Sequence, residues 1–255
     1  MLKIENTEVM GWEAAIRGMR NPMNSWEQSD TIIVDVPDTP RLNYSGNVVE
    51  IIPAHKQVVM RYEDGNWKGI GKNDIHLMTT LRNAGTDHRK FMRMITVYLD
   101  ITAPLYWWKE FDTYKVGTVA NSCSTMHKIA DKEFYMDDFS HEHLDDENLC
   151  WKYDEENRVN WRNSGVLALL YTIEALNAAH KKYLETKDKK YWWQMIQLLP
   201  SSYNQKRTIM LNYEVLANIY KSRRNHKLDE WHTFCDWIEG LPYSELITGK
   251  EEIND

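Results

Sequence analysis

The spacing of apolar residues after Ser164 constrains the fold more than any other feature of this sequence. Valine, leucine, isoleucine and alanine recur there at steps of three and four residues, which is the period of a helix that buries one face. Ser164 is a suitable N-cap for this helix, and we expect the helix to end near residues 184–187. The chain beyond it predicts three more helices, at residues 191–199, 206–222 and 228–240.

The chain before Pro104 has a different pattern. β-branched and aromatic residues gather there in short runs bounded by turn residues. This pattern predicts strands at residues 31–36, 57–62 and 94–101. Two short helices are expected beside them, at residues 11–19 and at residues 74–83, the second capped by Asn73.

Together these patterns predict one α+β domain over residues 1–255. Residues 1–104 are expected to be rich in strands and residues 105–255 rich in helices. Within residues 105–255, the acidic and irregular stretch 131–157 is expected to be a solvated excursion of the same domain.

Composition excludes several classes of protein. The net charge of −7 argues against a protein that coats nucleic-acid polymers, because neutralising phosphates requires a basic face. No apolar run approaches the roughly 20 residues of a membrane-spanning helix, so no membrane partner is expected. The charged N-terminus lacks the apolar core of a signal peptide, and the chain has only three cysteines. These features predict a cytoplasmic protein.

A group of cations lies within and just beyond the helix expected at residues 206–222. Glu214 is the one acid between Lys206 and Leu228, so the group has a strong positive charge. Such a group could bind a phosphate, for which arginine is the better ligand, or it could simply stabilise a helix C-terminus in water. Its members are Lys206, Arg207, Lys221, Arg223, Arg224 and Lys227.

Two further clusters contain residue types that carry chemistry. The polar run from Asn121 to His127 could present hydroxyl and amide donors to a phosphate, or it could be a helix-capping loop. Cys123 within it has no neighbouring base in the sequence that would activate it. His141-Glu142-His143 lacks the spacing of zinc motifs and fits a solvated acidic loop better, so no metal site is expected.

A spaced set of residues follows Leu199-Pro200. Asn212, Asn218 and Arg223 occupy the positions of the first Asn, the second amide or imidazole and the last Arg in the pattern N-x-R-x-L-x-[HN]-F-x-x-L-R. This pattern after a Leu-Pro resembles the late signature of the flavin-dependent thymidylate synthases. Glu214 stands where that family usually has an arginine, which reverses the charge.

A second stretch extends the resemblance upstream. After Ala103-Pro104, Asn121 and Ser124 match the Asn and the second Ser of the family motif R-H-R-x-x-S-x-N-E-x-S-x-R-Y. Ser122 replaces the Glu of that motif and His127 replaces its Tyr. Lys115 is the one cation left of the RHR triplet, and His88 is the nearest match to an upstream histidine of the family.

The resemblance implies an α+β fold with an antiparallel sheet packed with helices. It implies that Ser124 and Arg223 are catalytic and that Ser122, Ser124, His127 and Arg223 bind a nucleotide. It also implies a set of residues on the flavin side. These are His88, Lys115, Asn121, Asn212 and Asn218.

The resemblance leads to two hypotheses about function. In the first, the protein is a divergent enzyme that methylates dUMP or modifies a related base. FAD would be its cofactor, NADPH and methylene-tetrahydrofolate its co-substrates, and a homotetramer its assembly. In the second, the fold is kept but the chemistry is lost with the arginines of the motif, and the protein binds or sequesters a small-molecule nucleotide. A purely structural protein is a third alternative if neither class of ligand binds.

Overall fold

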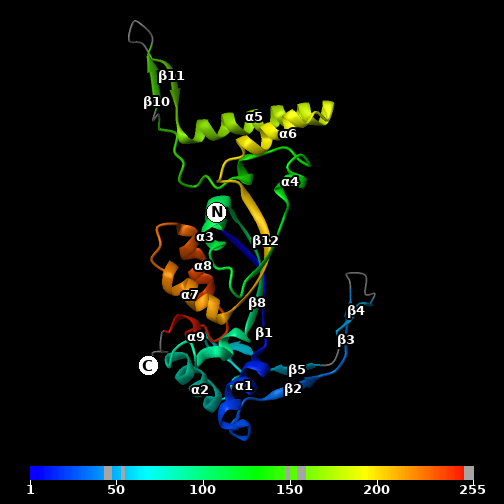
Figure 1. The fold of residues 1–255 in the computed structure, drawn as a ribbon, viewed down its shortest axis with the longest axis vertical. Coiled ribbons are helices and arrows are strands. Elements are labelled where there is room, and N and C mark those ends of the chain that lie inside the picture. Colours follow the sequence, from blue (N-terminus) through cyan, green and yellow to red (C-terminus); the bar gives the residue numbers. More distant parts are fainter. Residues whose placement is uncertain (43–47, 53–54, 148–149, 154–158, 250–255) are drawn as a thin grey trace. The chain divides into compact units, whose positions relative to one another are not determined.

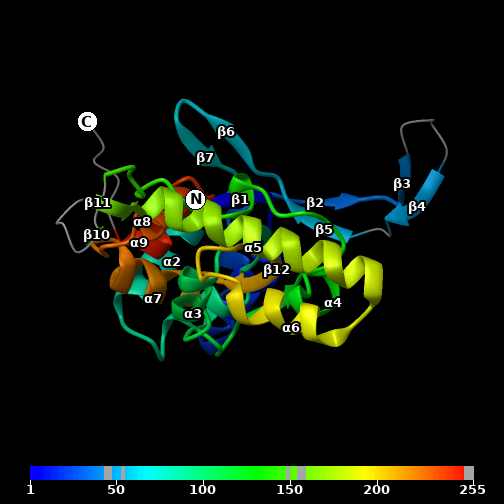
Figure 2. The same cartoon turned by 90° about the horizontal axis from the view of Figure 1, so that it is seen from above.

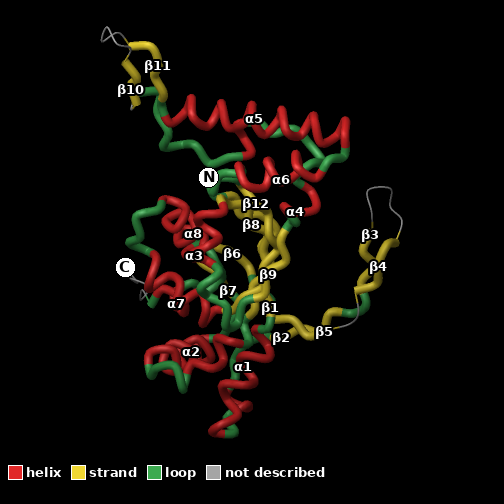
Figure 3. Tube along the Cα trace, turned by 45° about the horizontal axis from the view of Figure 1, so that its top comes forward, coloured by secondary structure: helices red, strands yellow, loops and turns green. Residues whose placement is uncertain are grey.

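Four strands form the main sheet, in the order β1-β8-β12-β9. They are β1 (Lys3–Met10), β8 (Thr96–Pro104), β12 (Asn204–Asn212) and β9 (Val119–Ser122). Figure 3 shows strands in yellow and helices in red. The other strands pair as antiparallel two-stranded sheets. Strands and helices both build the molecule, so the α+β class expected from the sequence is confirmed.

This computed structural model describes residues 1–42, 48–52, 55–147, 150–153 and 159–249. The chain divides into two compact units. Unit 1 comprises Met1–Asn6, Leu99–Thr113 and Ala120–Ile209, and unit 2 comprises Thr7–Tyr98, Tyr114–Val119 and Met210–Asp255. A single domain over residues 1–255 stays a prediction.

Unit 1 is built around a pair of helices, α5 (Gly165–Thr186) and α6 (Lys189–Leu198), which lie side by side (Figures 1 and 2). Ser164 caps α5 by accepting a 3.2 Å hydrogen bond from the backbone N–H of Leu167. The spaced apolar residues of α5, among them Ile173 and Leu176, are buried with Met195 of α6. The helix predicted after Ser164 from its apolar period and the helix predicted at 191–199 are both confirmed. Unit 1 also contains α3 (Leu105–Phe111), α4 (Thr125–Lys128), η4 (Met136–Asp138), β10 (Cys150–Tyr153) and β11 (Val159–Asn163).

Unit 2 contains the helices at both ends of the sequence. The early ones are α1 (Trp12–Arg20), η1 (Asn21–Met23), η2 (Trp26–Gln28), α2 (Lys72–Asn83) and η3 (Arg89–Arg93). The late ones are α7 (Tyr213–Arg223), α8 (Asp229–Glu239) and α9 (Glu245–Thr248). Its two-stranded sheets pair β2 (Ile33–Val36) with β5 (His55–Val58), β3 (Thr39–Leu42) with β4 (Val48–Ile52), and β6 (Arg61–Glu63) with β7 (Asn66–Lys68).

A buried ion pair joins α1 to α2 in unit 2. Arg20 Nη2 lies 2.7 Å from Asp74 Oδ1, and the side chains are 3% and 0% exposed. The hydroxyls of Ser29 and Thr31 each donate a 2.6 Å hydrogen bond to Asp74 Oδ2. Because every charge here has a partner, the cost of burying the pair is offset.

The helix predicted at residues 206–222 is wrong in its first half. That half belongs to strand β12, and α7 begins only at Tyr213. In β12 the buried residues Ile209 and Leu211 alternate with the less buried Thr208 and Met210, which is the period of a strand. Thr208 also donates a 2.6 Å hydrogen bond to Asp100 of β8.

Two smaller expectations are also corrected. The strand predicted at 57–62 is interrupted, because β5 ends at Val58 and β6 begins at Arg61. Gly71, not Asn73, precedes α2, and the Asp30 carboxylate accepts hydrogen bonds from the first N–H groups of that helix, at 2.9 Å from Asn73 N.

The acidic stretch 131–157 is only partly described, because residues 148–149 and 154–157 lie outside the described residues. Its described part is not merely solvated. Phe134 and Phe139 are 3% and 2% exposed and belong to the core beneath α5. Among the helices that the structure describes, none has the length and apolar content needed to cross a membrane.

Candidate functional site

Helix α7 in unit 2 carries several of the residues expected to bind a ligand. Asn212 is its N-cap, and Asn212 Oδ1 accepts a 3.1 Å hydrogen bond from the N–H of Val215. Glu214 and Asn218 follow one turn apart, and Arg223 is the last residue of the helix. Helix α7 and its N-cap therefore fix the positions of these four polar residues along one axis.

Two arginines neutralise Glu214. Arg89 Nε lies 3.4 Å from Glu214 Oε1, and Arg93 Nε donates a hydrogen bond to Glu214 Oε2. Arg89 Nη2 also lies 3.5 Å from Asn218 Oδ1. Burial raises the pKa of the Glu214 carboxyl, but the hydrogen bonds and charges of Arg93 and Arg89 outweigh it and hold this pKa below its ordinary value. The reversed charge at position 214 thus has partners from η3, directly after the exposed His88.

Arg223 lies between two aromatic rings. Arg223 Nε donates a 2.9 Å hydrogen bond to the hydroxyl of Tyr114. Its guanidinium carbon is 4.8 Å from the centroid of the Trp231 ring and 5.7 Å from that of Tyr114. Cation–π contacts and the hydrogen bond to Tyr114 therefore help to hold the half-buried guanidinium. The adjacent Arg224 instead pairs with Asp236 at 2.6 Å.

The segment Tyr114–Val119 contacts both ends of α7 within unit 2. Tyr114 contacts Arg223, whereas Gly117 lies against the N-cap. A Cβ atom placed on Gly117 would lie 3.0 Å from Asn212 Nδ2 and 3.1 Å from a methyl carbon of Val215. Gly117 has a φ of +80°, so both its conformation and its surroundings favour glycine. Lys115, between these contacts, is exposed.

In unit 1 the polar run from Asn121 to His127 joins the end of β9 to the start of α4. Asn121 and Ser122 are exposed on β9. Ser124 is the N-cap of α4, and its hydroxyl oxygen accepts a 3.2 Å hydrogen bond from the N–H of His127. That bond leaves the hydroxyl proton of Ser124 available as a donor. Ser124 therefore has the capping role that was one of the two expectations, and phosphate binding by this run stays a prediction.

The cations singled out in the sequence are divided between the two units. Lys206 and Arg207 lie on β12 in unit 1 and pair with carboxylates. Lys206 Nζ is 3.1 Å from Asp100, and Arg207 Nη1 is 2.7 Å from Asp112. Hydrogen bonds from Thr208, Asn6 and Lys206 lower the pKa of Asp100 to about 2. The remaining cations, Lys221, Arg223, Arg224 and Lys227, lie in unit 2.

Two residues of the run His141-Glu142-His143 have protein partners. The Glu142 carboxylate forms a 2.8 Å ion pair with the N-terminal amine, and His141 Nδ1 lies 2.8 Å from the carbonyl of Phe139. Across the described ranges no group of three or more His, Cys, Asp or Glu side chains could hold a metal ion. Of the cysteines, Cys123 is free and exposed, and Cys235 is free and buried.

Three residues that contact the predicted ones were not found from the sequence. They are Arg93, Tyr114 and Trp231. Arg93 and Glu214 are separated by 121 residues and Tyr114 and Arg223 by 109, so no local pattern connects them. Trp231 lies on α8, and the turn between α7 and α8 brings it to Arg223.

Comparison with known proteins shows the fold. No protein-family model matches the sequence, and no curated protein matches it. A solved structure of a flavin-dependent thymidylate synthase ThyX from Helicobacter pylori, complexed with FAD and dUMP, is similar with a TM-score of 0.59. It is 16% identical, over 97% of this chain and 98% of that one. A second structure of that enzyme with FAD and dUMP has a TM-score of 0.58 and 16% identity, over 98% of both chains.

A related fold belongs to a UMP/dUMP methylase, PolB from Streptomyces cacaoi, bound with 5-Br dUMP. Its TM-score is 0.51 at 12% identity, over 94% of this chain and 89% of that one. The chain therefore has the fold of the flavin-dependent thymidylate synthases, as the resemblance implied.

Proposed function

We propose that this protein binds a pyrimidine nucleotide and acts as a divergent flavin-dependent thymidylate synthase-like enzyme, methylating dUMP or modifying a related base. The proposal is supported by a fold shared over nearly the whole length of both chains with proteins whose structures hold FAD and dUMP. The single observation that carries it within this chain is the placement of Arg223.

Arg223 has the properties of a phosphate ligand. A guanidinium presents a planar fork of donors that matches a phosphate group. Tyr114 and Trp231 restrain this fork from two sides, so less conformational freedom would be lost when a ligand binds. We assign Arg223 to the nucleotide phosphate. We also propose Ser122, Ser124 and His127 as nucleotide ligands, with Ser124 and Arg223 catalytic.

The donor chemistry of the proposed flavin residues fits FAD. Lys115, His88 and Asn218 are exposed and offer an ammonium, an imidazole and an amide, the donor types that a pyrophosphate and a flavin ring accept. Asn121 is also exposed, whereas Asn212 uses its oxygen to cap α7. When bound, FAD would relay hydride from NADPH, and methylene-tetrahydrofolate would supply the carbon unit.

A second function is favoured by the ion pairs of the arginines that contact α7. Arg89 and Arg93 are both paired with Glu214, so their charge is partly neutralised before any ligand arrives. A site with fewer available cations holds FAD less strongly, because each lost charge-assisted hydrogen bond costs about 1.5–3 kcal/mol. The alternative is thus a protein that binds or sequesters a nucleotide without flavin chemistry.

The experiment compares the wild-type protein with Arg223→Gln and, as a matched control, Arg224→Gln. Freshly purified protein is examined for flavin absorbance, and dUMP and FAD are titrated by calorimetry. We expect dUMP to bind the wild-type protein and the control alike, and Arg223→Gln to bind it about 10- to 150-fold more weakly. Arg223→Lys, which keeps the charge, should recover part of the loss.

The outcomes separate the two functions. Binding of both FAD and dUMP supports the enzyme, and binding of dUMP without FAD supports the nucleotide-binding alternative. If neither ligand binds, or if Arg223→Gln binds dUMP as well as wild type does, the proposal is wrong.

A further inference from the structure

The side chain of Gln205 on strand β12 contacts the chain on both sides of Ser124. Gln205 Nε2 donates a 2.9 Å hydrogen bond to the carbonyl of Cys123 and a 3.2 Å hydrogen bond to the hydroxyl of Thr125. These residues all belong to unit 1. One amide group thus holds the residue before Ser124 and the residue after it.

Arg207 determines which end of the Gln205 amide faces these residues. Arg207 Nε donates a 3.0 Å hydrogen bond to Gln205 Oε1. A guanidinium can only donate, so it must meet the amide oxygen, and the amide nitrogen is left to face the acceptors at Cys123 and Thr125. Gln205 and Arg207 are two residues apart on one strand, which places both on the same face of the sheet.

Arg207 is in turn held by two contacts of its own. Its guanidinium carbon lies 4.2 Å from the centroid of the Trp108 ring, and its Nη1 lies 2.7 Å from Asp112 Oδ1. The Arg207 side chain is only 14% exposed, so water screens these contacts weakly. Trp108 also donates a 3.0 Å hydrogen bond from Nε1 to the carbonyl of Gln205. The guanidinium is therefore fixed before it orients the amide.

Two further hydrogen bonds anchor the run from Asn121 to His127. The N–H of Cys123 donates a 2.9 Å hydrogen bond to the carbonyl of Lys206 on β12. The indole N–H of Trp192 on α6 donates a 3.3 Å hydrogen bond to the carbonyl of Met126. The Ser124 hydroxyl, which retains its proton as a donor, lies between these anchors in the sequence.

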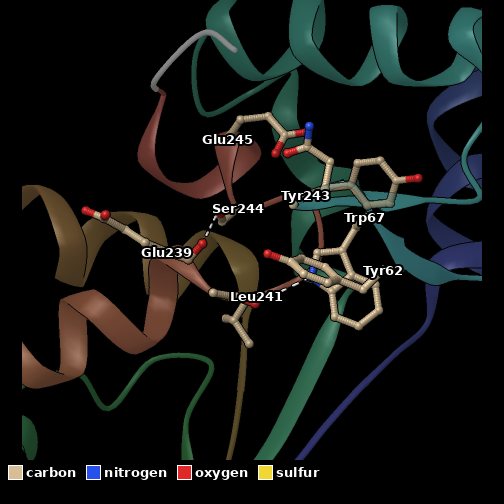
Figure 4. Close-up of a pocket in the computed structure, with 10 residues that line it drawn as sticks. Tyr62, Trp67, Glu239, Leu241, Tyr243, Ser244 and Glu245 are labelled. Atoms are coloured by element: carbon tan, nitrogen blue, oxygen red, sulfur yellow. Dashed lines mark hydrogen bonds between the residues drawn. The ribbon is translucent and has the colours of Figure 1, made fainter. Parts of the chain in front are cut away.

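A pocket in unit 2 shows the opposite arrangement, because a charged group of its lining is already paired. This pocket, drawn in Figure 4, has a volume of about 100 Å³ and lies between the β6–β7 hairpin and the chain from α8 to α9. The Glu239 carboxylate in its lining accepts a hydrogen bond from the hydroxyl of Tyr220 and lies 3.4 Å from Arg224 Nε. A ligand there would compete with protein partners for this carboxylate.

From the contacts around Ser124 we infer that Gln205 is a positioning residue for the proposed nucleotide site. Gln205 holds Cys123 and Thr125 so that the Ser124 hydroxyl is presented to the nucleotide, and Arg207 sets the orientation of the Gln205 amide. Both residues act through Ser124 and are not themselves ligands. The inference rests on the proposed function for the identity of the ligand.

The first measurement follows the run without any ligand. Amide hydrogen exchange of the peptide containing residues 121–127 is measured by mass spectrometry in the full-length wild-type protein, in Gln205→Met and in Gln197→Met. Methionine keeps the length of the glutamine side chain but has no N–H donor. We expect about tenfold faster exchange in Gln205→Met, because losing its hydrogen bonds makes local opening easier. Gln197, exposed on α6, is the control and should leave the rate unchanged.

A double-mutant cycle then tests whether Gln205 acts through Ser124. The affinity for dUMP is measured by calorimetry in Gln205→Met, in Ser124→Ala and in the double variant. Each single variant should bind dUMP about tenfold more weakly than wild type. Once residue 124 is alanine, Gln205→Met should cause less than about a twofold further loss. A merely structural contribution of Gln205 would instead multiply with the loss from Ser124→Ala.

Two more variants separate the parts of the amide. Gln205→Glu keeps an oxygen for Arg207 and removes only the Nε2 donors, so it should reproduce the effects of Gln205→Met in both measurements. Arg207→Lys keeps a charge beside Asp112 but loses the Nε–H, and should give a smaller loss of dUMP affinity, about threefold.

The outcomes distinguish this inference from the proposed function. If dUMP does not bind the wild-type protein, the proposed function and the role of Gln205 toward a nucleotide are both wrong, whereas faster exchange in Gln205→Met still supports the ordering of the run by Gln205. If dUMP does bind, wild-type exchange rates in both Gln205→Met and Gln205→Glu, or independent losses in the cycle, would overturn the inference and leave the proposed function standing.

Discussion

At the scale of single residues, Glu214 shows how a reversed charge is accommodated. The side chain is 8% exposed, so an unpaired carboxylate there would be strongly unfavourable. Arg89 and Arg93 are brought to it by η3, more than 120 residues earlier in the chain. The sequence shows the reversal, but only the tertiary contact shows that two arginines compensate it.

Glu214→Gln is expected to lower the free energy of unfolding by about 1–3 kcal/mol, because Arg89 loses a charged partner while remaining largely buried. Glu214→Arg, which places three guanidinium groups together, should destabilise further. Urea denaturation at neutral pH measures both. Glu185→Gln on α5 is the control and should change stability by less than about 0.5 kcal/mol, and a similarly small effect of Glu214→Gln would contradict the ion-pair assignment.

The same residue predicts a pH dependence. The pKa of Glu214 is lower in the folded protein than its ordinary value near 4.5. Its stabilising contribution is therefore complete above that value and is lost as the pH falls through the lower pKa of the folded state. Denaturation midpoints between pH 7 and pH 3 should fall less steeply in Glu214→Gln than in wild type, and parallel curves would show that Glu214 does not contribute.

At the scale of elements, what the sequence could predict depends on where each element finds its partners. The apolar face of α5 follows from the spacing of residues within the helix itself, and its N-cap, Ser164, is adjacent to it in the sequence. Both were therefore predicted correctly. Strand β12 was not, because nine residues that pair between strands β8 and β9 carry few apolar residues of their own. The cap of α2 was also missed, since Asp30 reaches it from 43 residues away.

Within the candidate site, too, some features could be predicted from the sequence and others could not. Asn212, Asn218 and Arg223 could be selected because they match positions of a family signature. The contacts of Tyr114 and Trp231 with Arg223 could not be predicted. They depend on how the segment Tyr114–Val119 and α8 pack against α7. Arg223 could therefore be identified as a candidate, but its aromatic surroundings could not.

The packing of the segment Tyr114–Val119 against α7 predicts different effects at two glycines. Gly117→Ala and Gly85→Ala both place alanine at a positive φ, which costs about 1–2 kcal/mol. A Cβ on Gly117 also meets Asn212 and Val215, whereas in the described part of the chain nothing lies within 4 Å of a Cβ on Gly85. Thermal denaturation should show the larger loss for Gly117→Ala, and equal losses would argue against this packing.

At the scale of the whole molecule, the homotetramer stays a prediction that the measured mass can test. The homotetramer implied by the family resemblance predicts a mass four times that of the 30.3 kDa chain. Helix α5 offers a surface for such contacts, since Leu170 and Tyr171 are 38% and 53% exposed on it.

Light scattering after size exclusion measures the mass. The wild-type protein should elute as the tetramer, and Tyr171→Glu should shift it toward smaller species because a charge would have to be buried. Tyr135→Glu, at a tyrosine that is 60% exposed outside α5, serves as the control. A monomeric wild-type protein would contradict the proposed assembly.

The course of the backbone through the two units has a consequence for how the gene can be altered. The chain passes from one unit to the other five times, after Asn6, Tyr98, Thr113, Val119 and Ile209. Neither unit is a continuous stretch of codons, so no truncation can yield one of them intact. A recombination event that exchanged either unit with a relative would need five crossovers, and we expect the two halves of this protein to be inherited together.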